Sequence, residues 1–145
     1  MQFFIFIPLL QVHGHLLNLF HKPISMNNRI IECVPNISEG RDLEKINAIA
    51  RVVESVEGIK LLDIDPGKAT NRTVITFVGE PEKVIEAAFL LIKKAAELID
   101  MSKHQGEHPR FGATDVCPLI PISGISMKET AAFAAIGVCV PATES

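Results

Sequence analysis

The sequence lacks the features on which several common protein classes depend. It has 3 cysteines in 145 residues and no C-x-x-C pair, so neither a disulfide framework nor a structural zinc site is expected. Reduced thiols and a cytoplasmic location follow as the default. Dense runs of Lys and Arg are also missing, and the formal net charge of −3 gives no general attraction for nucleic acid or for an anionic membrane.

Charged residues are absent from the first 20 positions. This stretch contains an apolar run from Phe3 to Leu10, but no Lys or Arg precedes the run and no small-residue cleavage site follows it. Polar residues such as Gln11 and His13 keep it well short of a membrane span. We therefore expect residues 1–28 to be an apolar extension of uncertain structure. Export or membrane anchoring is the alternative, which the native N-terminus would test.

What the chain does have is a regular pattern of apolar residues. Its apolar fraction of 48% and charged fraction of 21% are typical of a globular protein with one domain. The spacing of apolar residues, Gly and Pro predicts strands at 30–34, 59–65, 72–79 and 116–122, and helices at 42–56, 81–101 and from 126. This order predicts an α+β fold, the ferredoxin-like split βαβ sandwich, with one mostly antiparallel sheet and helices on one face. The domain is expected to span 29–130.

The most polar stretch, residues 99–118, lies between a long helix and a strand. Gly106 and Pro109 interrupt both helical and strand patterns, so we expect a loop held by rigid neighbours. Its segment from His104 to His108 fits the H-x-x-E-H pattern of one class of zinc proteases. That pattern needs a helix, which Gly106 and Pro109 disfavour, so no metal is expected. A solvated basic turn is the plainer alternative.

Three polar loops at strand ends, 36–41, 63–72 and 103–115, contain the candidate ligand groups. Spacing alone does not decide whether they converge. The candidates are His108 for proton transfer near neutral pH, Asp65 and Glu107 as carboxylates, and Arg72 and Arg110 as clamps for anions. For Asp65, a purely structural role at the end of a strand is an equal alternative.

Four segments, in order along the chain, resemble the formiminotransferase family, whose activity is that of glutamate formimidoyltransferase. They are E-C-V-P-N-I-S-E-G at 32–40, D-x-D at 63–65, T-N-R-T-V with F-V-G between 70 and 79, and I-D-M-S-K-H-x-G-E-H-P-R-x-G-A with D-V-C-P between 99 and 118. The likeness covers residues 29–130. It implies transfer of a formimino group from N-formimino-L-glutamate to tetrahydrofolate in histidine breakdown.

The resemblance also implies which residues act. The histidine of the G-E-H-P-R motif, His108, would be the catalytic base. The further candidates for binding substrate or folate are Asn36, Asp65, Asn71, Arg72, Glu107 and Arg110. Tetrahydrofolate would be the co-substrate, and no metal or nucleotide is required. His104 has no role that the resemblance implies, and we expect a surface histidine of little effect there.

A transferase unit of this family would contain two ferredoxin-like subdomains with the folate between them, and would often dimerise. The chain departs from that pattern, because the apolar stretch 131–141 replaces a polar helix and residues 131–145 resemble a truncated, atypical end. We expect this chain to be an incomplete unit without the second subdomain, whose activity needs a homo-oligomer or a complementary second subdomain. The alternative is a non-catalytic folate-binding or self-association module derived from the family.

Overall fold

The structure is a computed structural model that describes residues 29–107 and 109–138. Its strands are β1 (Ile30–Cys33), β2 (Asn36–Ile37), β3 (Lys60–Gly67), β4 (Arg72–Gly79), β5 (Thr114–Val116) and β6 (Leu119–Ser123), and its helices are α2 (Leu43–Glu54), α3 (Pro81–Leu98), the 3-10 helix η1 (Met101–Lys103) and α4 (Met127–Val138). The expected extension 1–28 and residues 139–145 of the expected atypical end lie outside the described residues. No described helix is long and apolar enough to cross a lipid bilayer.

Prolines divide two of the strands. Pro35 follows β1, and Pro118 lies between β5 and β6, because proline has no N–H to donate to a neighbouring strand. The Val34 N–H still donates to the Pro118 carbonyl at 3.2 Å, so the two interruptions lie side by side. With each divided strand counted once, the order is β3, β4, β1/β2, β5/β6, and all neighbours are antiparallel. The predicted ferredoxin-like arrangement is confirmed.

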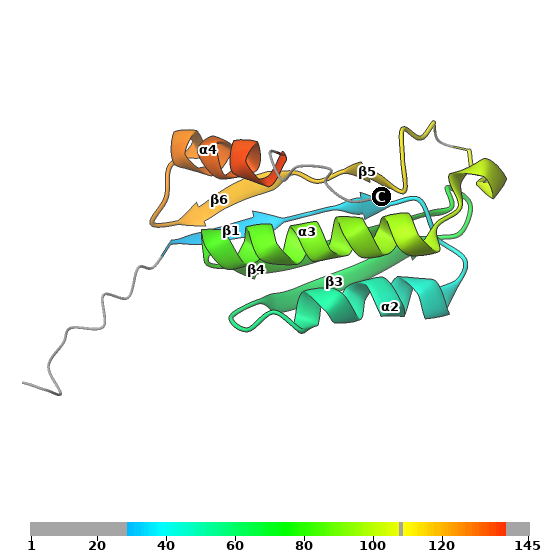
Figure 1. Cartoon of the computed structure of the whole chain (residues 1–145), viewed down its shortest axis with the longest axis horizontal. Coiled ribbons are helices and arrows are strands. Elements are labelled where there is room, and N and C mark those ends of the chain that lie inside the picture. Colours follow the sequence, from blue (N-terminus) through cyan, green and yellow to red (C-terminus); the bar gives the residue numbers. More distant parts are fainter. Residues whose placement is uncertain (1–28, 108, 139–145) are drawn as a thin grey trace, which may run out of the picture.

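Both long helices cover the same face of the sheet. Figure 1 shows α2 and α3 side by side across the strands, and α4 packs against α3 and β6. Alternation along β4 turns Thr73, Ile75 and Phe77 toward the helices, where all three are fully buried. The helices contribute Ile46, Ile49, Val53, Val84, Ala87, Leu91 and Ala95 to this core. Each large apolar side chain buried here stabilises the fold by roughly 1.5–3 kcal/mol.

Polar side chains determine where two helices begin. The Asp42 carboxylate accepts hydrogen bonds from the backbone N–H groups of Glu44 and Lys45, and so caps α2. At the start of α4, the Ser126 N–H donates to Glu129 at 2.8 Å and the Glu129 N–H donates to the Ser126 hydroxyl at 3.2 Å. Both helices begin within one residue of the start that the sequence predicts.

Candidate functional site

Asn71 joins three loops that are far apart in the sequence. Its backbone φ of 49° is left-handed, a conformation that Asn tolerates better than most residues. Its buried side chain accepts the Gly40 N–H at Oδ1 (2.9 Å) and donates from Nδ2 to the Gln105 carbonyl (3.0 Å). The three polar loops at the strand ends therefore converge. We call these segments, residues 36–41, 63–72 and 103–115, the loop cluster.

Further hydrogen bonds to backbone carbonyls hold the loop cluster together. Ser38 donates its N–H to the Ala113 carbonyl at 2.8 Å and its hydroxyl to the Gly112 carbonyl at 2.7 Å. The Thr73 hydroxyl donates to the Glu39 carbonyl. Both hydroxyl-bearing residues are fully buried, so each of these bonds replaces water that the carbonyl would otherwise bind. The loops are thus fixed by specific polar contacts rather than by apolar burial.

Two glycines allow the backbones in the loop cluster to approach closely. A Cβ atom at Gly40 would collide with the Gly67 carbonyl and with the Arg72 backbone nitrogen. A Cβ atom at Gly106 would collide with the Thr70 carbonyl. Glycine alone leaves room for these contacts, because it has no side chain.

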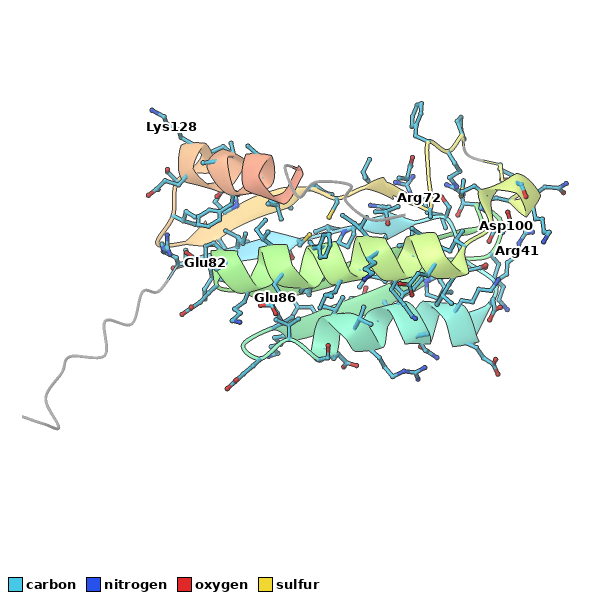
Figure 2. The ribbon with its side chains drawn as sticks, viewed as in Figure 1. Arg41, Arg72, Glu82, Glu86, Asp100 and Lys128 are labelled. Carbon is cyan, nitrogen blue, oxygen red and sulfur yellow. The ribbon has the colours of Figure 1, made fainter. Side chains whose placement is uncertain are left out.

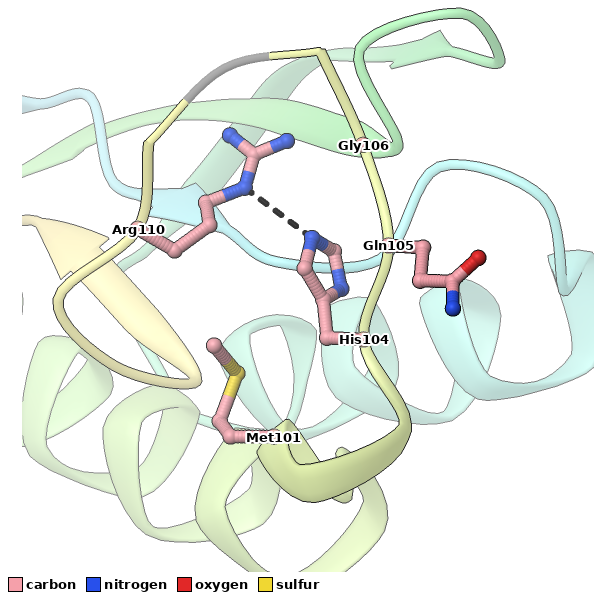
Figure 3. Close-up of a pocket in the computed structure, with 5 residues that line it drawn as sticks. All are labelled: Met101, His104, Gln105, Gly106 and Arg110. Atoms are coloured by element: carbon pink, nitrogen blue, oxygen red, sulfur yellow. Dashed lines mark hydrogen bonds between the residues drawn. The ribbon is translucent and has the colours of Figure 1, made fainter.

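Arg110 fills the space between two of these loops. Its Nη2 donates to the carbonyls of Thr70 and Asn71, the latter at 3.1 Å. Its Nε donates to His104 Nε2 at 3.2 Å, the contact drawn as a dashed line in Figure 3. Burial, and then the nearby charge of Arg72, lower the pKa of Arg110, although a guanidinium stays protonated at neutral pH. Arg110 is therefore a cation held in one orientation.

Arg72 lies at the start of β4 among polar side chains of the neighbouring strands. Its Nε donates to Asn36 Oδ1 at 2.8 Å, and its Nη2 lies 3.7 Å from Asp115 Oδ2. The Asp115 side chain is nearly buried, so its charge faces Arg72 with little screening by water. Figure 2 shows Arg72 at the same end of the molecule as Arg41 and Asp100, which is the end where the loops meet.

Two cavities open on the loop cluster, and His104 lines both. The larger has a volume of about 570 Å³ and is lined by Met101, His104, Gln105, Gly106 and Arg110 (Figure 3). The smaller has a volume of about 220 Å³ and is lined by Ser38, Glu39, Lys45, Asn71, Ile99, Asp100, Lys103 and His104. The larger cavity has the size of a small-molecule site, and its wall carries the Arg110 cation.

The backbone between His104 and Glu107 is not helical, as the sequence predicts. It therefore does not present the helical surface that the H-x-x-E-H pattern of zinc proteases requires. Within residues 29–107 and 109–138, no group of three or more His, Cys, Asp or Glu side chains could hold a metal ion.

Comparison with known proteins decides the family. A family model described as the formiminotransferase domain, N-terminal subdomain, matches residues 30–140. The chain belongs to the formiminotransferase family. This N-terminal subdomain is similar to formimidoyltransferase-cyclodeaminase of Mus musculus, with 57% identity over 102 residues. It is also similar to glutamate formimidoyltransferases of Thermoplasma acidophilum and Streptococcus pyogenes serotype M1, with 50% identity over 99 residues and 48% over 101 residues.

The similarity covers most of this chain and a smaller part of each relative. The three matches cover 70%, 68% and 70% of the chain, but 19%, 33% and 34% of the mouse, Thermoplasma and Streptococcus proteins. The chain thus spans between a fifth and a third of the length of the curated relatives it matches. For this subdomain, the activity of the whole relatives is therefore a proposal.

Four of the predicted site residues of this formiminotransferase subdomain are bonded in pairs within the loop cluster. Arg72 donates to Asn36, and Arg110 donates to the Asn71 carbonyl. Asp65 and Glu107 are both exposed, and their roles as carboxylates of the site stay predictions. Asp65 lies on β3 opposite Val74. His108 lies outside the described residues, so its role as catalytic base stays a prediction.

Sequence reasoning missed three residues that the structure places in the loop cluster. His104, expected to be a surface residue of little effect, is half-buried, accepts a hydrogen bond from Arg110 and lines both cavities. In the sequence, its spacing from His108 indicates only a metal-binding pattern. Ser38 and Asp115 were missed because a short polar residue beside a strand end has an ordinary turn role in most proteins.

Proposed function

We propose that this subdomain takes part in transferring the formimino group from N-formimino-L-glutamate to tetrahydrofolate, the reaction of glutamate formimidoyltransferase in histidine degradation. The observation that carries the proposal is the convergence of the motif-bearing loops around a cavity of about 570 Å³. Relatives with 50% and 48% identity bear the name of this enzyme. The alternative is a non-catalytic folate-binding or self-association module.

The transfer needs proton movement and charge recognition. The secondary amine of the pteridine attacks the amidine carbon, forming a C–N bond and losing a proton to His108. Collapse of the tetrahedral adduct breaks the bond to the glutamate nitrogen, which takes a proton as it leaves. A histidine suits both steps because it titrates near neutral pH. The transfer changes no oxidation state, so no redox cofactor is needed. We propose that tetrahydrofolate is the co-substrate that accepts the group and that no metal takes part.

The fixed cations of the loop cluster match the anionic groups of both substrates. Formiminoglutamate and the folate tail carry carboxylates, which bind arginine strongly through charge-assisted hydrogen bonds. Arg110 faces the larger cavity, whereas Arg72 is partly neutralised by Asp115 at 3.7 Å. We therefore propose that Arg110 provides most of the attraction for substrate carboxylates, with Arg72 and Asn36 shaping the floor of the site.

The sheet face opposite the helices has exposed apolar side chains that a partner protein could cover. Four apolar side chains on the strands are exposed to 37%, 45%, 39% and 55%: Ile30, Val116, Ile120 and Ile122. Exposed apolar side chains grouped on one face commonly mark a protein interface. We propose that a second ferredoxin-like subdomain, or another copy of the chain in a homo-oligomer, covers this face and completes the folate site. The free thiols of Cys33 and Cys117 are consistent with a cytoplasmic setting.

A chimera tests the proposal directly. Residues 30–130 would replace the matching segment of the Thermoplasma acidophilum enzyme, which supplies the second subdomain. We expect tetrahydrofolate-dependent release of glutamate from formiminoglutamate within about tenfold of the parent rate, because the motif loops are kept intact. A chimera that folds and binds tetrahydrofolate without releasing glutamate would favour the non-catalytic alternative.

A further inference from the structure

The orientation of the Asn71 side-chain amide is fixed by two independent contacts. Oδ1 receives the Gly40 N–H at 2.9 Å, and Nδ2 faces the Gln105 carbonyl at 3.0 Å. A flipped amide would put two donors together at Gly40 and two acceptors together at Gln105. Nδ2 carries a second hydrogen, and the next polar atom it meets is His104 Nδ1 at 3.4 Å.

The tautomer of His104 follows from its other ring nitrogen. Arg110 Nε is always a donor, and it lies 3.2 Å from His104 Nε2, so Nε2 must be the nitrogen without a proton. In a neutral imidazole the proton then resides on Nδ1. An imidazolium would place an N–H at Nε2 against the Arg110 cation. The contact to a charged donor is also the shorter of the two, and it decides the tautomer.

Two N–H donors therefore face each other across 3.4 Å, His104 Nδ1 and Asn71 Nδ2. Two donors cannot satisfy each other, and both border the cavity of about 220 Å³. The charged side chains that line this cavity already have partners within the chain. Lys45 Nζ lies 3.7 Å from Asp42 and 4.0 Å from Glu39, and Lys103 Nζ lies 2.9 Å from Asp100. Glu39 Oε1 also accepts the N–H groups of Arg41 and Asp42. An acceptor atom from outside the chain would satisfy both donors at once.

We propose that His104 and Asn71 form a two-donor subsite that binds a carboxylate oxygen of the amino-acid substrate. A carboxylate oxygen has two lone pairs and can accept from both N–H groups, whereas the cationic amidine of formiminoglutamate has only donors to offer. The Arg110 cation behind His104 adds to the preference for an anion. The identity of the substrate rests on the proposed function, but the donor pair rests on the hydrogen-bond geometry alone.

The first test reads the tautomer without any ligand. Long-range ¹H–¹⁵N spectra of the full chain at pH 7.5 distinguish Nδ1–H, Nε2–H and doubly protonated histidine, and the His104→Gln variant identifies the His104 signals. We expect the Nδ1–H pattern for His104. An Nε2–H pattern, or an imidazolium pattern, overturns the subsite.

The second test adds N-formimino-L-glutamate and, separately, L-glutamate, which shares the carboxylates but has no formimino group. We expect both compounds to shift the His104 Nδ1–H and Asn71 side-chain N–H resonances. The His104→Phe variant should bind both roughly 10- to 100-fold more weakly, since a hydrogen bond to a charged group is lost. His104→Gln, whose amide can again donate and accept, should recover part of the affinity.

Phe111→Ala is the matched control, because its side chain is 95% exposed in the same loop and contributes no donor. It should bind like the wild type. The subsite is overturned if neither compound shifts the two resonances, or if His104→Phe binds within twofold of the wild type. Binding through this donor pair by a chain whose chimera transfers no formimino group would refute the proposed function alone. Transfer with unchanged affinity in His104→Phe would refute the subsite alone.

Discussion

The core beneath α2 and α3 and the loop cluster at the strand ends are stabilised by different forces. In the core, Phe77, Ile75 and their neighbours are fully buried and gain stability from the apolar area removed from water. In the loop cluster, Asn71 and Ser38 donate or accept at specific backbone groups. The core should therefore govern stability, and the loop cluster should govern activity.

Replacing His108 with Asn should separate activity from stability most strongly. In the chimera, turnover should fall by roughly 10²–10⁴-fold, the usual contribution of a positioned acid–base group. Substrate binding and melting temperature should change little, because Asn keeps a polar side chain of similar size at this position. The measurement is the rate of glutamate release at saturating tetrahydrofolate, together with a thermal melt.

Substituting each of the two histidines of the motif should change a different kinetic parameter. His104→Phe removes a binding donor, so the KM for formiminoglutamate should rise while kcat stays near the parent value. If His104→Phe abolishes turnover and His108→Asn keeps most of it, the assignment of the base is wrong.

Phe77→Ala tests the core. The side chain is fully buried on β4, so truncation should destabilise the subdomain by about 3–5 kcal/mol through lost burial and the cavity left behind. Urea unfolding of the chain provides the measurement. Phe111→Ala makes the same chemical change at a side chain that is 95% exposed, and should stay within about 0.5 kcal/mol of the wild type. Equal losses in the two variants would contradict the described core.

Asn71→Asp tests whether the loop cluster depends on a single donor. The substitution keeps the shape and the acceptor for the Gly40 N–H, but it places an oxygen against the Gln105 carbonyl. We expect a loss of about 1–3 kcal/mol from the unpaired buried groups. Amide hydrogen exchange should show the loss near residues 104–106, with the core amides still protected. Uniform loss of protection would show that the loops and the core unfold as one unit.

The pattern of apolar residues predicted the core, whereas only the structure revealed the loop contacts. Alternation in β4 and the i, i+3, i+4 spacing in α2 reflect periodic backbones, so burial follows from position in the sequence. The hydrogen bond between Asn71 and Gln105 leaves no periodic signal in the sequence. It depends on a left-handed backbone and on the approach of two distant loops. The family motif pointed to Arg110 but not to His104, whose role depends on which ring nitrogen faces the guanidinium.

The smallest expected effect concerns the charge on Asp100, at the edge of the loop cluster. Its carboxylate accepts from the Ser102 hydroxyl at 2.6 Å and from the Ser102 N–H at 3.1 Å, and it lies 2.9 Å from Lys103 Nζ. The Ser102 hydroxyl first, and then Lys103, lower the pKa of Asp100 to about 2. Because the side chain is about half exposed, solvent and salt screen these interactions, and the effect on stability should be slight.

The direction of the pH dependence is nevertheless defined. The carboxyl of an unfolded chain titrates near pH ~3.9, above the folded pKa of about 2, so the charged form stabilises the fold at higher pH. That contribution should shrink as the pH falls below about 4 and vanish as it passes through about 2.

Asp100→Asn keeps an oxygen acceptor for the Ser102 N–H, so the difference in melting temperature between wild type and variant isolates the charge. The difference should be constant between about pH 7 and pH 5 and decline in more acidic buffer. A difference that persists unchanged at pH ~3 would show that the neutral hydrogen bonds, and not the charge, hold this end of the loop cluster.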